Sequence, residues 1–250
     1  MVKKIISVIT VLILSKSVSA QEGESYLGLQ LSPTFSWMKS DDNLINGNGI
    51  KLGFRIGGTA DYYIDDWLIV SGGFGFSFSQ GGKLLHTVGG NLLPDSEVDA
   101  QYRQGDKPLP DGTDITYSLQ MLEVPIALKY VIGLPKQNFD LFLSFPEINV
   151  ALIGKSRGNI DATGIELSKQ NIGGDVRPFN LSWGVGAGIR YFTVGDQLVS
   201  ASLHLEQGLS DLTSNDGVQT STLPNGSLSK KDEDSKGTLN ALVFKFALFF

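Results

Sequence analysis

Apolar and small polar residues alternate along eight segments of the chain. In the first segment, apolar Leu27, Leu29 and Leu31 are separated by Gly28 and Gln30. This is the two-residue period of a β-strand, in which successive side chains point to opposite faces. The eight segments cover residues 27–37, 50–62, 68–79, 117–130, 139–152, 179–191, 199–206 and 242–250. Most have the length of roughly 10 residues that a tilted strand needs to cross the hydrocarbon core of a membrane.

Two segments depart from strict alternation. In the fourth, Tyr117 and Met121 are out of phase with Val124, and the adjacent apolar pair Met121 and Leu122 predicts a β-bulge. In the fifth, Pro146 interrupts the alternation, which makes residues 139–152 the least regular segment.

The connections between the segments alternate in length. Three are short (residues 63–66, 131–138 and 193–197), and four are long and polar (residues 38–49, 80–115, 154–177 and 210–237). This alternation, with both chain ends on the short side, is typical of an outer-membrane barrel. The pattern therefore predicts an all-β fold: an eight-stranded antiparallel up-and-down transmembrane β-barrel with long extracellular loops.

The first twenty residues have the features of a secretory signal peptide. Lys3 and Lys4 are followed by an apolar stretch at residues 5–14 and by Val18-Ser19-Ala20, a typical cleavage site. The alternative is a buried N-terminal helix or strand. We expect cleavage of residues 1–20 and a mature domain of residues 21–250, exported to the outer membrane of a Gram-negative bacterium.

Composition excludes several classes of function and structure. The chain has 20 Lys and Arg against 26 Asp and Glu, a formal charge of −6, and loss of the basic leader makes it more acidic. An acidic chain with few basic clusters is a poor nucleic-acid binder. The absence of cysteine excludes disulfides, thiolate metal sites and a cysteine nucleophile. After residue 20, no apolar run reaches the roughly 18 residues of a transmembrane helix.

The polar face of the segments distinguishes two kinds of barrel. It consists of Gly, Ser, Thr, Asn and a few charged residues, which fit the narrow lumen of an eight-stranded barrel and could not line an apolar ligand pocket. The charged residues that this pattern turns inward are Lys51, Arg55, Asp61, Glu123, Lys129, Glu147, Arg190, Glu206 and Lys245, together with His204. Because the two signs are nearly balanced, we expect pairs across the lumen that plug the barrel.

Several short motifs resemble a known family. They are Gly53-Phe54-Arg55-Ile56-Gly57, residues 71–76, residues 122–130, residues 206–211 and the terminal Phe250. Together they resemble the PorT-like outer-membrane β-barrel domain of Bacteroidota. The resemblance implies an outer-membrane barrel and little about activity, although some members are tied to protein secretion and gliding. In similar proteins a terminal aromatic residue is read by the barrel-insertion machinery, so Phe250 is the expected assembly signal.

One cluster has the residue types of a hydrolase. Ser202, His204 and Glu206 lie on one face of the seventh segment and could act as nucleophile, base and orienting acid. However, neighbours on one strand face are about 7 Å apart, and this face is the lumen. We therefore expect no catalytic site, no cofactor and no metal.

Two other features have a structural interpretation. The run Asp232-Glu233-Asp234 could bind a cation but is expected to be a solvated loop, and His86 is expected to be solvated in a long loop. Gly184, Gly186 and Gly188 lack the spacing of a nucleotide-binding turn and fit a tight lumen.

Two classes of function follow from this reading. The first is a non-enzymatic outer-membrane barrel whose long loops bind an extracellular or envelope partner; its other expected partners are outer-membrane lipid or lipopolysaccharide and the insertion machinery. The alternatives are a small enzyme that hydrolyses lipid A or peptides, and a narrow solute channel.

Overall fold

The computed structural model describes residues 24–99, 101–102, 107–133, 138–193, 197–214, 216–222 and 227–250. The predicted leader, residues 1–20, lies outside these described residues. The elements are β1 (Ser25–Ser40), β2 (Ile45–Gly47), β3 (Ile50–Asp65), β4 (Leu68–His86), β5 (Gly90–Asn91), β6 (Thr113–Gly133), β7 (Phe139–Ala162), β8 (Ile165–Asn171), the 3-10 helix η2 (Gly173–Asp175), β9 (Phe179–Phe192), β10 (Leu198–Gly208), β11 (Val218–Thr222), β12 (Leu228–Asp232) and β13 (Gly237–Phe249).

Eight of these strands close into a ring. They pair in the order β4, β3, β1, β13, β10, β9, β7 and β6, and β6 pairs again with β4. All of these pairings are antiparallel. The prediction of eight antiparallel strands is confirmed. Within the described part of the chain, closure leaves the eight ring strands without a free edge, as a strand structure in lipid requires.

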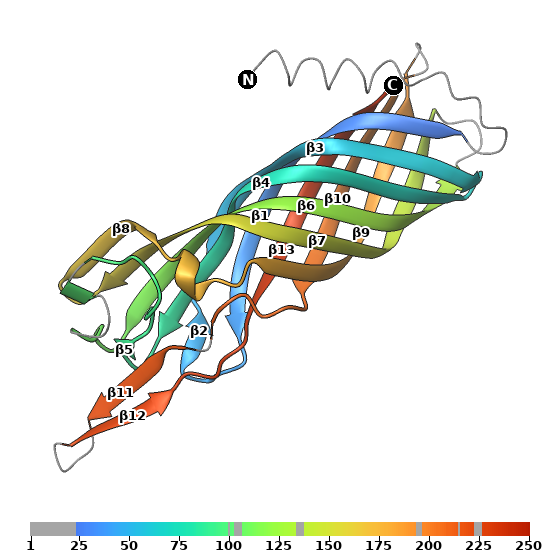
Figure 1. Cartoon of the computed structure of the whole chain (residues 1–250). Helices are drawn as coiled ribbons and strands as arrows, with labels where there is room; N and C mark the ends of the chain where they lie inside the picture. Colours follow the sequence, from blue (N-terminus) through green and yellow to red (C-terminus); the bar gives the residue numbers. More distant parts are fainter. Residues whose placement is uncertain are drawn as a thin grey trace, which may run out of the picture.

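The two ends of the barrel differ (Figure 1). Short connections and the C-terminus lie at one end, here called the short-turn end. The other, here called the long-loop end, carries β8 and a three-stranded sheet of β12, β11 and β5. No helix among the described residues is long and apolar enough to cross a membrane.

Two segments predicted to be long loops contain much strand. β4 continues to His86 and β7 to Ala162, and β8 pairs with the extended part of β7. The reading of residues 80–115 and 154–177 as loops is therefore wrong in part. Their outward polar residues hide the strand pattern, because beyond the lipid there is no need for an apolar outer face.

The strand pairing is irregular next to Met121–Leu122, where the sequence predicts a bulge, but the extra residues are not on β6. Odd-numbered residues of β6 stay on the inner face from Thr113 through Glu123 to Ala127. The extra residues belong to the neighbours: β4 between Ser77 and Gln80, and β7 opposite the Gln120–Met121 step. A third irregularity, between Ser144 and Glu147 of β7, gives residues 139–152 their register. Proline fits there because it has no N–H for the ladder.

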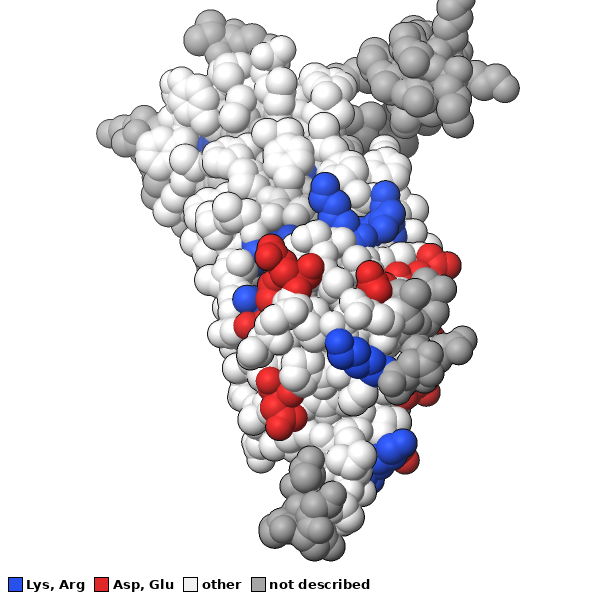
Figure 2. All heavy atoms as spheres, turned by 90° about the vertical axis from the view of Figure 1, so that its left-hand side faces the viewer, with Lys and Arg blue, Asp and Glu red and all other residues white. Residues whose placement is uncertain are grey.

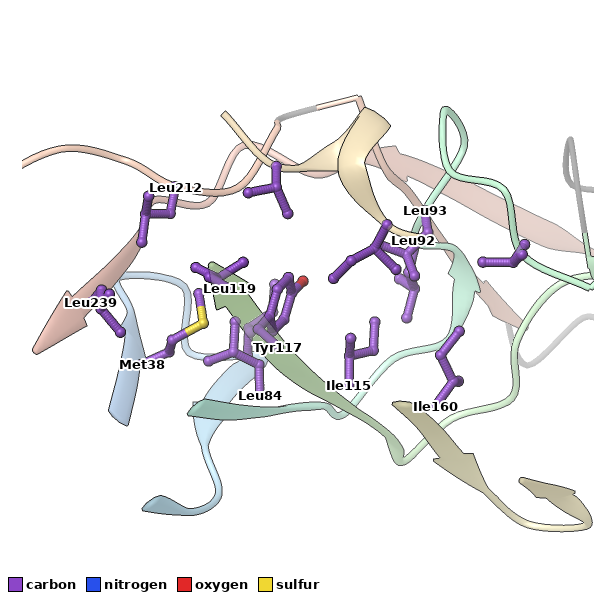
Figure 3. Close-up of a cluster of buried hydrophobic side chains, with 14 of the residues drawn as sticks. Met38, Leu84, Leu92, Leu93, Ile115, Tyr117, Leu119, Ile160, Leu212 and Leu239 are labelled. Carbon is purple, nitrogen blue, oxygen red and sulfur yellow. The ribbon is translucent and has the colours of Figure 1, made fainter. Parts of the chain in front are cut away.

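The inner face of β6 changes from charged to apolar because the barrel holds a hydrophobic core under its long-loop end. Figure 3 shows this cluster: Met38, Leu84, Leu92, Leu93, Ile115, Tyr117, Leu119, Ile160, Leu212 and Leu239. We call these ten residues the apolar cluster. They come from ring strands and from the long connections, so the loops and the barrel share one core.

The outer surface of the ring strands is apolar. Large residues such as Leu29, Phe74 and Ile126 are more than half exposed on alternate positions, as a lipid-facing band requires. In Figure 2 the upper part of the molecule, which is the barrel wall, is almost free of charged residues. At the short-turn end Trp67 stacks on Tyr130, with ring centroids 6.3 Å apart, which fits an aromatic belt at an interface.

Candidate functional site

The candidate site is the charged layer inside the barrel, between the apolar cluster and the short-turn end. Arg55 of β3 donates to both carboxylate oxygens of Glu206 on β10, with distances of 2.7 and 2.9 Å. Its Nε atom lies 3.3 Å from Glu123 of β6. Glu123 also accepts a hydrogen bond of 3.1 Å from Asn149. One buried cation thus joins β3, β6 and β10, no two of which are neighbours in the ring, and it binds Glu206 in the two-pronged geometry that suits a guanidinium.

A second group lies nearer the short-turn end. Lys129 of β6 donates to both oxygens of Asp61 on β3, at 2.8 and 2.9 Å, and Ser71 of β4 donates to the same carboxylate at 2.6 Å. The Asp61 side chain is fully enclosed. These bonds meet the requirement that a buried charge be both paired and hydrogen-bonded.

Arg190 forms the third group, at the short-turn end. It donates to Asp140 at 3.0 Å and to the hydroxyl of Tyr63. The alternation of residues predicts that Arg190 faces the lumen, but it does not indicate Asp140, which lies in the irregular fifth segment. The signal was the register: Asp140 on β7 is directly opposite Arg190 on β9.

The fourth group contains the geometry of a hydrolase triad. The His204 Nε2 atom lies 2.9 Å from the Ser202 hydroxyl, and Nδ1 lies 2.6 Å from Glu147 Oε2. Lys245 contacts the other oxygen of Glu147. The sequence predicts that Ser202 and His204 lie too far apart; this is wrong, because the two side chains lean together along the strand.

The orienting acid is Glu147 of β7 rather than Glu206, which binds Arg55. β9 lies between β7 and β10, and its Gly186 and Gly184 stand opposite His204 and Glu147 respectively. A Cβ at Gly186 would lie 2.2 Å from His204 Nδ1. Because Gly184 and Gly186 have no side chains, His204 and Glu147 meet although their strands are two apart in the ring.

The space beside this group is small. The cavity lined by Ser202, His204, Glu147 and Lys245 has a volume of about 30 Å³. That is room for one or two water molecules. A nucleophile, a base and an orienting acid are present, but a substrate could reach them only if the lumen opened.

Three sequence-predicted residues lie outside the charged layer. Lys51 lines a hollow together with polar residues of β6, β7 and β8. Phe250 follows β13, and its backbone N–H donates to the Leu27 carbonyl of β1 at 2.9 Å, which helps to seal the ring. Its role in assembly stays a prediction.

Glu233 is not solvated as predicted but buried, where it accepts a hydrogen bond from Ser235. The described residues contain no group of three or more potential metal ligands.

His86 is also buried rather than solvated. As the last residue of β4 it pairs with Ile45 and Thr113. Burial lowers the pKa of His86 to about 4, so the ring is neutral at pH 7. Burial raises the pKa of the nearby carboxyl groups of Asp175 and Glu233. The long-loop end therefore contains buried ionisable side chains.

We expect Glu206→Gln to destabilise the barrel more than Glu123→Gln. Glu206 makes two short bonds to Arg55, whereas Glu123 makes one longer contact and keeps its bond from Asn149. Underpairing the buried cation should cost about 3 kcal/mol in the first variant and less in the second. Guanidinium titration of the barrel refolded into lipid vesicles measures both. Equal losses would show that water, rather than Glu206, compensates Arg55.

Comparison with known proteins identifies relatives at the level of family. A family model described as "Outer membrane protein beta-barrel domain" matches residues 7–223. No curated protein sequence matches the chain.

Three solved structures illustrate the similarity. Neisserial surface protein A has 11% sequence identity, 91% of this chain and 99% of that chain covered, and a TM-score of 0.40. Ail, the attachment invasion locus protein of Yersinia pestis, has 12% sequence identity and a TM-score of 0.38. The match covers 92% of this chain and 100% of Ail. The outer membrane protease OmpT from Escherichia coli has 10% sequence identity and a TM-score of 0.39. The match covers 94% of this chain and 99% of OmpT. Similarity at this level carries no argument about activity.

Proposed function

The chain belongs to the outer membrane protein beta-barrel domain family, and from that premise we propose that it is a closed, non-enzymatic barrel that anchors a folded binding surface in the outer membrane. The observation that carries this proposal is that two layers of side chains fill the interior of the barrel. The charged layer fills the part inside the lipid-facing band, and the apolar cluster fills the long-loop end. A pore would need a water-filled path through both.

The order of the long-loop end supports a binding role. Asp175 of η2 accepts hydrogen bonds from the hydroxyl groups of Ser96 and Ser214, which lie on two other connections. The sheet of β5, β11 and β12 adds a second layer of order. A surface held in one conformation before binding loses less entropy when it meets a partner. The partner is an extracellular molecule or an envelope protein.

A finer assignment rests on the motifs. The resemblance of residues 53–57, 71–76 and 122–130 to PorT-like domains supports a place beside a secretion or gliding machine. In this view the lipid-facing band contacts outer-membrane lipid, and Phe250 contacts the insertion machinery during assembly.

We expect the purified protein to show no steady conductance in a planar lipid bilayer. The reason is that the paired charges bind one another instead of lining water. A stable, ion-permeable channel in the wild type would overturn the closed-barrel proposal in favour of a solute channel. A wide porin reconstituted in parallel confirms that the bilayer reports insertion.

We expect the long-loop end to face the cell exterior. Because the chain has no cysteine, single replacements can be labelled without background. An impermeant maleimide should label Leu228→Cys on β12 in intact cells. It should label Asp66→Cys, in the exposed turn between β3 and β4, only after the outer membrane is permeabilised. The reverse pattern would place the binding surface in the periplasm.

A second candidate function is hydrolysis, favoured by the contacts among Ser202, His204 and Glu147. The cavity of about 30 Å³ weighs against it, because it excludes a lipid or peptide substrate. On the closed-barrel proposal, a fluorophosphonate probe should leave the folded wild type unlabelled. Labelling that Ser202→Ala abolishes and the matched Ser200→Ala retains would favour the hydrolase.

A further inference from the structure

The outer wall of β6 and β7 changes character where the lipid-facing band ends. Leu122 and Leu152 are its last large exposed apolar residues on these strands. Beyond them, the directly opposed outward pairs are Gln120 with Lys155, Ser118 with Arg157, Thr116 with Asn159, and Asp114 with Asp161. Cations therefore come first, and carboxylates appear only three pairs further out. In Figure 2, blue and red side chains both lie below the uncharged upper wall, and blue ones are among those nearest to it.

The cations line one hollow. Lys51, Lys155, Arg157 and Lys169 surround a space of about 500 Å³ whose remaining lining residues are Thr, Ser, Gln and Asn. We call these four cations the basic groove. Among the residues that the structure describes, no carboxylate lines this hollow, although the chain as a whole is acidic. Lys83, which lies further out on β4, pairs with Asp114 at 3.2 Å.

The backbone holds two of these cations side by side. The Arg157 guanidinium donates to the Lys169 carbonyl at 2.9 Å, and the Lys169 N–H donates to Asn159 Oδ1 at 2.8 Å. Lys169 has φ 57°, a left-handed conformation that residues with a Cβ rarely adopt. It lies where the register of β7 and β8 shifts between Gly158 and Ile160. Arg157 and Lys169 of the basic groove are thus held in place by the strand pair β7 and β8.

Its depth matches a lipid headgroup. Lys155 is three residues beyond Leu152, which on a strand tilted by about 40° is roughly 8 Å along the membrane normal. The polar layer of a leaflet extends about 5–8 Å beyond the hydrocarbon. A lipid whose acyl chains rest on Leu122 and Leu152 would have its headgroup level with Lys155 and within reach of Arg157.

We propose that the basic groove binds the phosphate groups of a lipid in the leaflet that surrounds the long-loop end. Arg157 offers a planar fork for two phosphate oxygens, and the three lysines supply point charges around it. The apolar band directly beneath the groove selects a lipid over a soluble anion. This inference rests on the proposed function only for the leaflet that supplies the lipid.

The test uses the folded full-length barrel in maltoside micelles, which contain no phosphate. Bisphosphorylated lipid A is added in steps, and native mass spectrometry counts the lipid retained per protein. Lys155→Gln with Arg157→Gln should weaken retention by about 10- to 30-fold, the loss of two near-surface cations. The matched control, Lys230→Gln with Lys231→Gln on exposed β12, removes the same charge elsewhere and should change retention less than twofold. Both variants should keep the mobility of a folded barrel on unboiled gels.

Three results would overturn the proposal. Equal retention by the two double variants would mean that net charge alone attracts the lipid. Unchanged retention in Lys155→Gln with Arg157→Gln would mean that the groove is not the site. Displacement of lipid A by millimolar inorganic phosphate would mean that the groove binds a soluble anion. None of these results bears on the conductance of the barrel, so the closed-barrel proposal stands or falls separately.

Discussion

An eight-stranded ring is only just wide enough to be filled by its own side chains, and this constraint governs the whole molecule. An inward charged residue must find an oppositely charged partner across a short distance. Lipid outside and a filled interior leave little water that could take the place of a missing partner. Arg55, Lys129 and Arg190 each meet this demand with carboxylates from other strands. The interior is consequently a set of paired charges and not a passage.

The same constraint explains the position of the irregularities. Without extra residues, β4 and β7 would keep one register against β6 from the charged layer into the apolar cluster. Extra residues on β4 and β7 shift these neighbours against β6, while β6 itself keeps its odd-numbered residues inward. Tyr117 and Leu119 then enter the core that also receives Leu92 and Leu212 from the long connections. The loops thus gain their order from the barrel interior.

The sequence predicts the structure best where the environment forces apolar and polar residues to alternate along a strand. Lipid outside and polar residues inside impose strict alternation, so all eight ring strands can be found from residues such as Leu27 to Leu31. Above the lipid the outer face has no such requirement, and the ends of β4 and β7 are consequently read as loops. Burial of His86 and Glu233 depends on contacts between connections far apart in the chain, which no local pattern reports.

The partner of His204 illustrates a different limit. Local spacing suggests Glu206, four residues from Ser202 on the same face, but the glycines of β9 open the way to Glu147 on β7. Only the strand order reveals that two glycines stand between them. The same small residues that make the lumen narrow therefore decide which charges meet. Because these contacts fill the interior, other molecules can bind only at the outer surfaces. These are the ordered long-loop end and the basic groove at the margin of the lipid-facing band.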